Sequence, residues 1–315
     1  MLKTALDNLK IIVSIVLFIS IYNVFFTTEN TLVGVGIITA LLMFKDVNLK
    51  IKRNEGTIVV LLGLILAVIL PTFSRVNPLL GLLINSMYIF WITYISSERI
   101  SYKAYVTFIL LYVVTEGNPV SGDILLLRWA SIIIFAVIIA IIYYHNHKKE
   151  YPTIREVIKK TDQENAAFAL KLALSLSLAM FLTDIFNVYK HMWFTITVLS
   201  LSQLDLEVTH TRITQRVIYT LIGSVIYVVV FSILLPDNII TYVTLIMGYI
   251  YTFIKKYHIQ MIFVTISACI ANEIYFASTK EVVATRIILI ISGAIFAYLI
   301  SKINFKKYIH IYKRK

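Results

Sequence analysis

Charged residues are scarce in this chain, and cysteine is nearly absent. Asp, Glu, Lys and Arg form 15% of the 315 residues, whereas hydrophobic residues form 59%. Soluble domains carry about 25% charged and about 45–50% apolar residues. The composition, with a mean hydropathy of +0.84, therefore excludes a soluble protein and predicts an integral membrane protein. The one cysteine, Cys269, lies in an apolar run, so an internal disulfide is excluded and we interpret it as a small buried apolar residue.

Catalytic motifs are also missing. The sequence contains no Gly-x-Ser-x-Gly, His-Glu-x-x-His or Walker loop and no paired Asp-x-x-x-Asp, which argues against an enzyme. Among the histidines only His145 and His147 approach the spacing of metal ligands, so we predict neither a metal site nor a cofactor. Without an ATP site, any transport has to use an ion gradient or the gradient of the substrate itself.

Long apolar runs such as 132–142 show no alternation of polar and apolar residues, which excludes a membrane β-barrel and favours helices. The first run lacks a small-residue cleavage site, which favours an uncleaved span over a signal peptide. We predict an all-α integral membrane protein with about twelve transmembrane helices, at residues 11–26, 31–44, 57–72, 78–95, 102–115, 128–144, 166–186, 191–204, 215–235, 239–254, 259–274 and 283–301. The segments 31–44 and 191–204 are shorter than the ~20 residues of a perpendicular span, so flanking residues extend them or they are partly re-entrant.

The spans form an internal repeat, because polar and small residues recur at matched places in the two halves. The matched pairs are Lys10 and Lys171, Gly63 and Gly223, Glu116 and Glu273, Asp123 and Glu281, and Arg128 and Arg286. Charged residues in or beside apolar spans are costly, so chance explains this recurrence poorly. We predict two parallel six-helix repeats, because an even number of spans brings both units in from the same side, with the solute pathway between them.

The predicted organisation follows from this repeat. The first six-span membrane repeat covers residues 1–144 and the second covers 165–301. Between them, the hydrophilic residues 145–164 form a cytoplasmic linker, either a short amphipathic helix or a solvated charged tether. Residues 302–315 form a basic cytoplasmic tail whose lysines alternate with tyrosine and isoleucine, as in an interfacial anchor.

The positive charges are distributed unevenly along the chain. With the N-terminus in the cytoplasm, only Arg75, Lys190 and Lys280 fall in outer loops, and only Arg128, Lys171 and Arg286 fall within or at the edges of spans. The other 23 of the 29 lysines and arginines are on the inner side. This is the positive-inside pattern, and it places both termini in the cytoplasm. The net charge of +12 therefore reflects topology, with anionic lipids and not nucleic acid as the expected partner.

Residues around the predicted seventh to ninth spans carry a recognisable motif. Trp193 lies in His-Met-Trp-Phe-Thr-Ile-Thr, and Arg216 precedes Tyr219-Thr220-Leu221-Ile222-Gly223. With Ala169-Leu170-Lys171, they resemble the FUSC family, the fusaric acid resistance and aromatic acid exporter group. Its members typically have Ala-Leu-Arg opening a span, Trp opening the next, and Arg followed by Gly-Thr-Leu-x-Gly. Lys171 and Tyr219 depart from that pattern. The resemblance covers the second half, reaches the first through the repeat, and implies a bacterial inner-membrane exporter of aromatic or other carboxylic acids.

Two sets of charged residues lie on the predicted outer side, between the fifth and sixth spans of each repeat. They are Glu116, Asp123 and Arg128 in the first repeat, and Glu273, Glu281 and Arg286 in the second. Each arginine follows an acid by five residues, close enough for pairing or helix capping. We assign these sets to gating or proton coupling, because burial raises the pKa of an acid. The alternative is a structural salt bridge, or charges that are merely solvated.

The predicted inner side is cationic, with Lys10 and Lys171 near the starts of the first and seventh spans. Arg53, Arg212 and Arg216 fall in the loops before the third and ninth spans. An exported carboxylate needs a cationic entry surface, and arginine binds carboxylates bidentately. The alternative is topological anchoring by side chains whose apolar stems lie along the lipid.

Substrate binding is assigned to Lys171, Trp193, Arg216 and Thr220. Lys171 and Arg216 are favoured because the resemblance reaches them. Trp193 either stacks on an aromatic substrate or anchors the protein at the membrane interface. Thr220, close to Gly223, contacts substrate or permits close helix packing.

Together these features predict an inner-membrane secondary transporter that exports small organic anions, such as aromatic carboxylic acids, by alternating access between two halves. The main alternative is a non-transporting scaffold component of a cell-envelope complex. A central polar cavity between the halves would distinguish the transporter from the scaffold.

Overall fold

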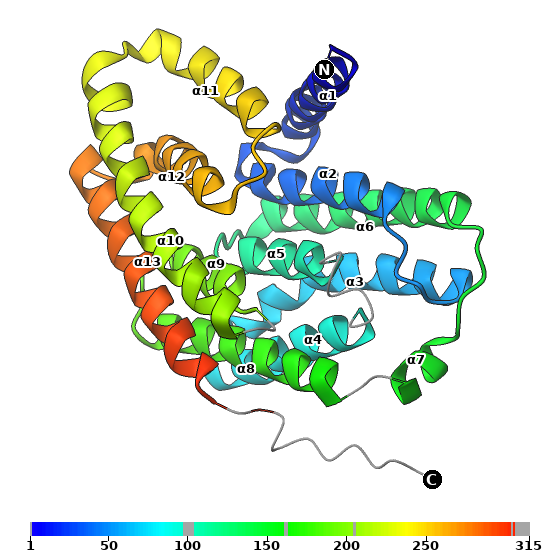
Figure 1. The fold of residues 1–315 in the computed structure, drawn as a ribbon. Coiled ribbons are helices and arrows are strands. Elements are labelled where there is room, and N and C mark those ends of the chain that lie inside the picture. The colour runs from blue at the N-terminus through cyan, green and yellow to red at the C-terminus, as the bar shows by residue number, and fades with distance from the viewer. Residues whose placement is uncertain (1, 97–103, 161–162, 204–205, 304, 306–315) are drawn as a thin grey trace. The chain divides into compact units, whose positions relative to one another are not determined.

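The computed structural model describes residues 2–96, 104–160, 163–203, 206–303 and 305. Within these ranges all regular structure is helical (Figure 1), which confirms the predicted all-α class. The helices are α1 Leu2–Phe26, α2 Thr31–Asp46, α3 Arg53–Ser74, α4 Pro78–Ile95, α5 Ala104–Glu116, α6 Gly122–Asn146, α7 Ile154–Lys160, α8 Gln163–Ile185, α9 Met192–Leu201, α10 Leu206–Ile226, α11 Asp237–Tyr251, α12 Tyr257–Asn272 and α13 Thr279–Ser301. Short helical turns cover Thr28–Asn30 (η1) and Glu273–Tyr275 (η4), and α10 continues as a π-helix over Tyr227–Leu234 (η3).

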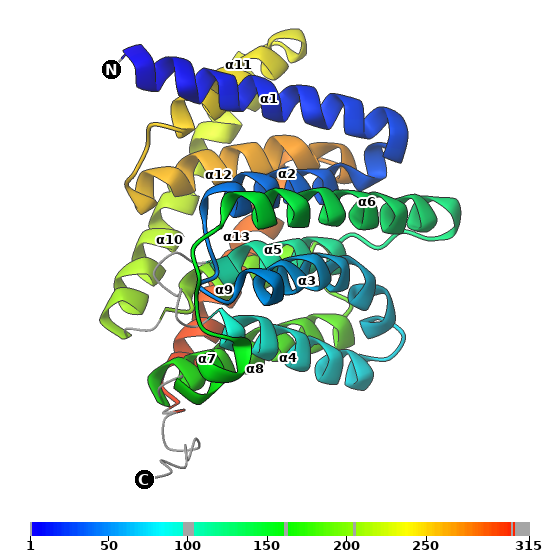
Figure 2. The ribbon, with the colours of Figure 1, turned by 90° about the vertical axis from the view of Figure 1, so that its right-hand side faces the viewer.

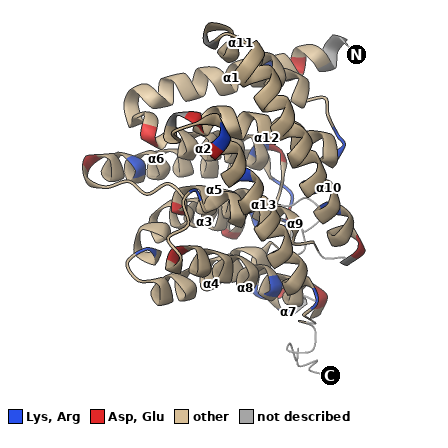
Figure 3. Cartoon of the chain, turned by 90° about the vertical axis from the view of Figure 1, so that its left-hand side faces the viewer, with Lys and Arg blue, Asp and Glu red and all other residues tan. Residues whose placement is uncertain are grey.

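Seven of the described helices are long and apolar enough to cross a bilayer. These spans are Ala5–Phe26, Arg53–Ser74, Pro78–Ile95, Gly122–Asn146, Gln163–Ile185, Glu207–Leu234 and Thr279–Ser301. Charged residues are few along the helices (Figure 3), and large apolar side chains such as Val24, Leu83 and Ile288 are exposed. Exposed apolar surface of this extent requires a lipid environment. The chain is a multi-pass membrane protein.

Every one of the twelve predicted spans overlaps a helix, and α7 lies in the predicted linker. Several of these helices are short, however. Helix α9 has 10 residues, which corresponds to about 15 Å against a hydrocarbon core of about 30 Å. Twelve complete crossings therefore stay a prediction. Residues 102–103 of the fifth predicted span, and the tail at 304 and beyond 305, lie outside the described residues.

The described chain divides into two compact units. The first unit combines Met1–Val16 with Thr197–Lys302, and the second contains Leu17–Ile196. This division does not follow the predicted repeat boundary at residue 165, because α8 packs against α4 and so joins the helices of the first half. The duplication itself stays a prediction.

The second unit is a bundle in which α3 packs against α4, α5 and α6, and α2 packs against α5 and α6 (Figures 1 and 2). Its interior contains many aromatic rings: the centroids of Phe44 and Phe108 are 4.9 Å apart, and Tyr88 stacks on Tyr112. The hydroxyl of Tyr88 donates to the Gly63 carbonyl at 2.8 Å. Tyrosines buried inside a membrane protein need such partners, because no water reaches their hydroxyls.

Helix ends that were predicted on one side of the membrane meet in this unit. The Lys52 amide donates to the Pro152 carbonyl at 2.8 Å, and the Leu49 amide donates to the Tyr143 hydroxyl at 3.1 Å. The Tyr94 hydroxyl also reaches the Ile158 carbonyl of α7. Leu49, Lys52, Pro152 and Ile158 were predicted in inner segments, and Tyr94 and Tyr143 at the inner ends of spans. The linker contains a helix fastened to the bundle and is not a solvated tether.

In the first unit, α10 packs against α12 and α13 (Figure 1). Leu201, Ala294 and Ala297 are buried together, and Ile213 and Val217 of α10 pack against them. Small residues at the contact allow helix backbones to approach closely, which is the usual way helices associate in lipid. At the start of α13, Ser278 accepts a hydrogen bond from the Glu281 amide and fixes the first turn.

Candidate functional site

A buried polar stripe runs along α10 in the first unit. Arg216, Thr220 and Ser224 recur every four residues and so lie on one face of the helix. They are 3%, 2% and 2% exposed. Tyr227, also buried, follows on the continuing π-helix. We call Arg216, Thr220 and Ser224 the α10 stripe.

Polar atoms of the α10 stripe lack hydrogen-bond partners. Nε of Arg216, Oγ1 of Thr220 and Oγ of Ser224 are buried and make no hydrogen bond within the part of the chain that the structure describes. Arg216 donates from Nη1 to the Met261 thioether of α12, which is a weak acceptor. Buried polar groups in native proteins are almost always satisfied, so unsatisfied ones indicate a missing partner or a functional role.

The position of Arg216 differs from the prediction. Arg212 and Arg216 were expected on the inner side beside the start of the ninth span at 215–235, but both lie well inside α10, which begins at Leu206. The error arose because Thr209, Thr211, Thr214 and the two arginines lower the hydropathy of the first turns. Arg212 is half-buried, with its guanidinium 4.9 Å from the centre of the Tyr257 ring, whereas Arg216 is buried.

Helix α12 approaches the stripe closely at Gly223. A Cβ atom placed there would lie 3.0 Å from the Ile262 carbonyl oxygen and 3.0 Å from Cβ of Thr265. Gly223 therefore serves close helix packing. Packing was one of the two alternatives given for this stretch of the sequence, the other being substrate contact. Its neighbour Thr220 is buried but makes no hydrogen bond through its hydroxyl, so packing alone does not account for it.

The second predicted gating set lies in the first unit as well. Arg286 of α13 is buried, Glu273 is half-buried and Glu281 is exposed. Oε1 of Glu273 accepts a hydrogen bond from the Thr279 hydroxyl at 2.8 Å, and Oε2 of Glu281 accepts from the Ala277 amide at 3.1 Å. Both acids thus fasten the turn that leads into α13.

In the second unit, Glu116 is the centre of a charged cluster formed at the ends of the four helices α3, α5, α8 and α9. Its Oε2 lies 2.9 Å from Nε2 of His191, and its Oε1 lies 3.8 Å from Nη1 of Arg75. Arg75 also donates to the Glu116 carbonyl. Ligand atoms of Glu116, Asp184 and His191 all lie within 4.8 Å of one another. Glu116 is completely buried, His191 is buried and Asp184 is half-buried.

His191, which immediately precedes α9, has a pKa shifted by its surroundings. Burial, the largest single influence, lowers the pKa of His191, but the hydrogen bond to Glu116 and the charges of Glu116 and Asp184 together outweigh it. The net result is a pKa above the ordinary value, so the imidazolium form is favoured by the cluster.

Arg75, Asp184 and His191 were not among the predicted site residues. Arg75 and His191 are 41 and 75 residues from Glu116 in the chain, and no local motif links them. The available signal was topological: all three fall at predicted outer ends of spans, as Glu116 does.

The first predicted gating set is only partly brought together. Nε of Arg128 donates to Oδ1 of Asn30 at 2.7 Å, and Nη1 donates to the Asn118 carbonyl at 2.8 Å. Asp123 is exposed in the first turn of α6. Among the described residues, no ion pair joins Arg128 to Glu116 or Asp123; the partners of Glu116 are Arg75 and His191.

Lys171 and Trp193, the other two predicted substrate residues, lie in the second unit. Lys171 is 8% exposed on α8, and Trp193 is 2% exposed in α9. A ring this deeply buried does not serve as an anchor at the lipid interface, which was one of the two alternatives for Trp193. Arg216 and Thr220, the other two predicted substrate residues, belong to the first unit.

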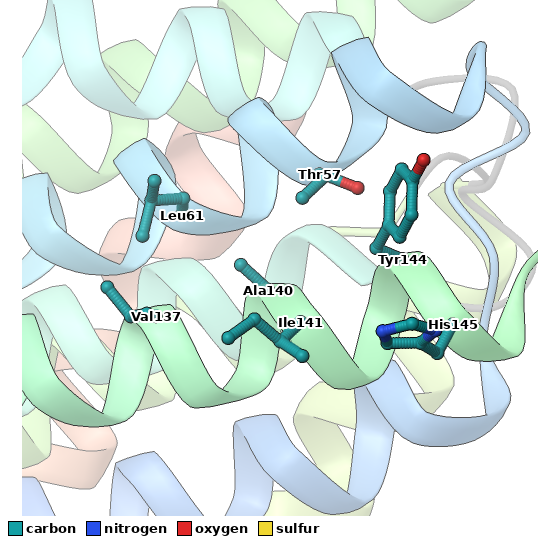
Figure 4. Close-up of a pocket in the computed structure, with 7 residues that line it drawn as sticks. All are labelled: Thr57, Leu61, Val137, Ala140, Ile141, Tyr144 and His145. Atoms are coloured by element: carbon teal, nitrogen blue, oxygen red, sulfur yellow. The ribbon is translucent and has the colours of Figure 1, made fainter.

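A shallow apolar cavity of about 260 Å³ lies between α3 and α6 in the second unit (Figure 4). Leu61 and Ala140 line its middle, and Tyr144 and His145 line one end. The guanidinium of Arg53 lies 3.9 Å from the centre of the Tyr144 ring. The lining suits a lipid chain better than a charged substrate, because its exposed surface is mostly apolar.

Comparison with known proteins finds a similarity within the second half of the chain. Residues 178–300 match the protein family described as fusaric acid resistance protein-like. This confirms the resemblance to the FUSC family, and the matched range includes Trp193, Arg216 and Thr220. No curated protein and no solved structure matches the chain.

Proposed function

We propose that this membrane protein is a secondary transporter that exports small organic anions, such as aromatic carboxylic acids. The α10 stripe carries the proposal, since it combines a buried guanidinium with two buried hydroxyls that lack partners. It also lies within residues 178–300, the range that matches the fusaric acid resistance protein-like family. An ionisable residue within a membrane span is costly and is retained mainly where it has a function.

The chemistry of the α10 stripe suits a carboxylate. Arg216 offers N–H donors in a planar fork that matches two carboxylate oxygens, and the hydroxyls of Thr220 and Ser224 offer further donors one and two turns along the helix. A carboxylate bound there would satisfy all three side chains and neutralise the arginine. No acidic side chain among the described residues forms an ion pair with Arg216.

The proposed alternating access takes place between two related halves of the chain. Several contacts support an internal duplication that would produce such halves. The pairs α3–α5, α3–α6 and α4–α5 recur as α10–α12, α10–α13 and α11–α12. A Cβ atom added at Gly63 would clash with Phe108, and one at the matched Gly223 would meet Thr265. Phe108 and Thr265 lie the same number of residues apart in the sequence as Glu116 and Glu273, so they are matched positions of the two repeats.

For the external gate, we propose the contact between Glu116 and Arg75, with Glu273 as the matched acid of the other half. Glu116 joins the end of α5 to the end of α3 through Arg75, so breaking it would free these ends. Asp123 and Arg128, near the start of α6, and Glu281 and Arg286, near the start of α13, have supporting roles. We further propose an inner-membrane location with cytoplasmic termini and anionic lipids on the inner face.

Transport by purified protein in proteoliposomes tests the proposal. Labelled benzoate supplies an aromatic carboxylate, and benzyl alcohol is the uncharged control of similar size. We expect saturable benzoate flux, no saturable benzyl alcohol flux, and a loss of at least tenfold in benzoate flux for Arg216→Ala, the order expected when a charged hydrogen bond worth about 1.5–3 kcal/mol is removed.

Arg212→Ala is the matched control, because Arg212 lies one turn away on the same helix but outside the buried stripe. It should retain most of the flux. Unchanged benzoate flux in Arg216→Ala, with the protein still folded by size-exclusion chromatography, would exclude Arg216 as the anion contact.

A non-transporting scaffold in a cell-envelope complex is the second candidate, supported by the extensive exposed apolar surface of helices such as α1. It predicts that no anion crosses the proteoliposome membrane under any gradient. It also predicts that Arg216→Ala changes only thermal stability.

A further inference from the structure

The cluster around Glu116 has the geometry of a metal site. Glu116 ends α5, Asp184 lies in the last turn of α8, and His191 immediately precedes α9. One ligand atom from each lies within 4.8 Å of the other two. In a tetrahedral site with bonds of about 2.0–2.2 Å, ligand atoms are separated by roughly 3.4 Å. The three side chains therefore need only small rotations to surround one ion.

The types of ligand narrow the choice of ion. One imidazole and two carboxylates suit zinc and its neighbours among the divalent transition metals, whereas calcium and magnesium prefer oxygen ligands alone. Three protein ligands leave a position for water or another group, as in many zinc sites. The half-buried Asp184 gives solvent access from one side of an otherwise buried cluster.

A second observation points independently to a missing cation. Oε1 of Glu116 is buried and accepts no hydrogen bond; its nearest cation, Arg75, is at the outer limit of an ion pair at 3.8 Å. Arg75 is itself 34% exposed and donates to the main-chain carbonyl of Glu116.

We propose that Glu116, Asp184 and His191 bind a divalent transition-metal ion of the zinc class at this end of the second unit. The ion would join the ends of α5 and α8 to the start of α9 and replace the direct contact between His191 and Glu116. Metal binding uses the neutral imidazole of His191. The inference does not depend on anion export, because binding is measured without any transport.

Binding of Zn²⁺ to the full-length protein in detergent, after removal of metal with EDTA, tests this proposal. Isothermal titration calorimetry should show one Zn²⁺ ion per chain and no comparable binding of Mg²⁺. Cobalt supplies a second readout, because Co²⁺ in a site of low coordination number, such as a tetrahedral one, absorbs visible light strongly. We expect Zn²⁺ to raise the thermal unfolding temperature as well, since a ligand that binds only the folded state stabilises it.

Three variants identify the ligands. His191→Ala and Asp184→Asn should weaken Zn²⁺ binding by at least the ~10–100-fold that follows loss of even an outer-shell partner. Glu116→Gln should also weaken Zn²⁺ binding. Because Glu116 is completely buried, this variant could fail to fold. Asp184 is less buried, so Asp184→Asn keeps the test valid in that case. His145→Ala is the matched control, since His145 and His147 are the pair with ligand-like spacing in the sequence.

The proposal is overturned if folded protein shows no saturable Zn²⁺ binding, or if His191→Ala and Asp184→Asn bind Zn²⁺ as the unchanged protein does. Loss of binding in His145→Ala alone would move the site to the linker and would also overturn it. Failure of Zn²⁺ binding leaves the role of Arg216 intact, and failure of benzoate flux leaves the metal site intact.

Discussion

Nε of Arg128 donates a hydrogen bond of 2.7 Å to Oδ1 of Asn30, and this pair joins the start of α6 to the turn before α2. Asn30 is completely buried, and its Nδ2 donates to the carbonyls of Phe26 and Ile124. Arg128 is 2% exposed. Nε and Nη1 of this buried arginine have neutral acceptors, whereas its Nη2 makes no hydrogen bond within the described residues, so the side chain depends on each acceptor that it has.

Replacement of Asn30 should therefore destabilise the protein. Asn30→Ala removes the acceptor of Arg128 and leaves part of a buried guanidinium unpaired, at a cost of about 3 kcal/mol. We expect a clearly lower thermal unfolding temperature in detergent. Asp123→Asn is the control: Asp123 is exposed, so it should change stability by less than about 0.5 kcal/mol. Equal losses in both variants would mean that Asp123 and Arg128 do form a pair.

Gly223 and Gly248 allow a matched test of helix packing. A Cβ atom at Gly223 would press on the Ile262 carbonyl oxygen of α12 at 3.0 Å, whereas nothing lies within 4 Å of one at Gly248 in α11. Gly223→Ala should cost about 1–3 kcal/mol through overpacking. Gly248→Ala should be neutral or stabilise by up to about 1 kcal/mol, because alanine is the better helix former. Thermal unfolding of both variants in one detergent measures the difference; the reverse order would contradict the close approach of α10 and α12.

Much of the fold is predictable from the sequence because bilayers demand long apolar helices. Each predicted span overlaps a helix, but the sequence misjudged where α10 begins, since Arg212 and Arg216 resemble loop residues in a hydropathy window. Which helices pack together was harder to predict from the sequence. The compact unit that contains α4 also contains α8, and this packing depends on side-chain shape that hydropathy does not report.

The candidate site was predictable only where a local motif marks it. Arg216 and Thr220 belong to one helical stretch, so the family resemblance reached both. The cluster of Arg75, Glu116, Asp184 and His191 joins ends of separate helices, and no periodic pattern records such an encounter. Arg128 and Asp123 are near in sequence, yet Asn30 is the partner that Arg128 contacts. Sequence proximity was a poor guide to pairing there.

Thr220→Val separates a binding role of Thr220 from a packing role. Valine keeps the volume and branching of threonine but removes a hydroxyl that has no hydrogen-bond partner in the buried stripe. Loss of an unsatisfied buried hydroxyl should leave stability unchanged or raise it. If the hydroxyl contacts substrate, half-saturation for benzoate should rise roughly 2–10-fold, the equivalent of one neutral hydrogen bond of about 0.5–1.5 kcal/mol. Unchanged half-saturation together with a higher unfolding temperature would assign Thr220 to packing alone. Ser224→Ala provides the same comparison one turn further along α10.

The orientation of the second unit can be read by labelling single cysteines. Cys269 is buried and is the only native cysteine, so Cys269→Ala provides a background without thiols. Val76→Cys places a thiol in the exposed turn between α3 and α4, and Lys149→Cys places one in the linker after α6. Because positive charge concentrates in the linker and its neighbouring segments, we expect that end to face the cytoplasm. An impermeant maleimide should label Val76→Cys on intact spheroplasts, and should label Lys149→Cys only after the membrane is permeabilised. The opposite pattern would reverse the orientation and place the cluster around Glu116 on the cytoplasmic side, where it would no longer serve as an external gate.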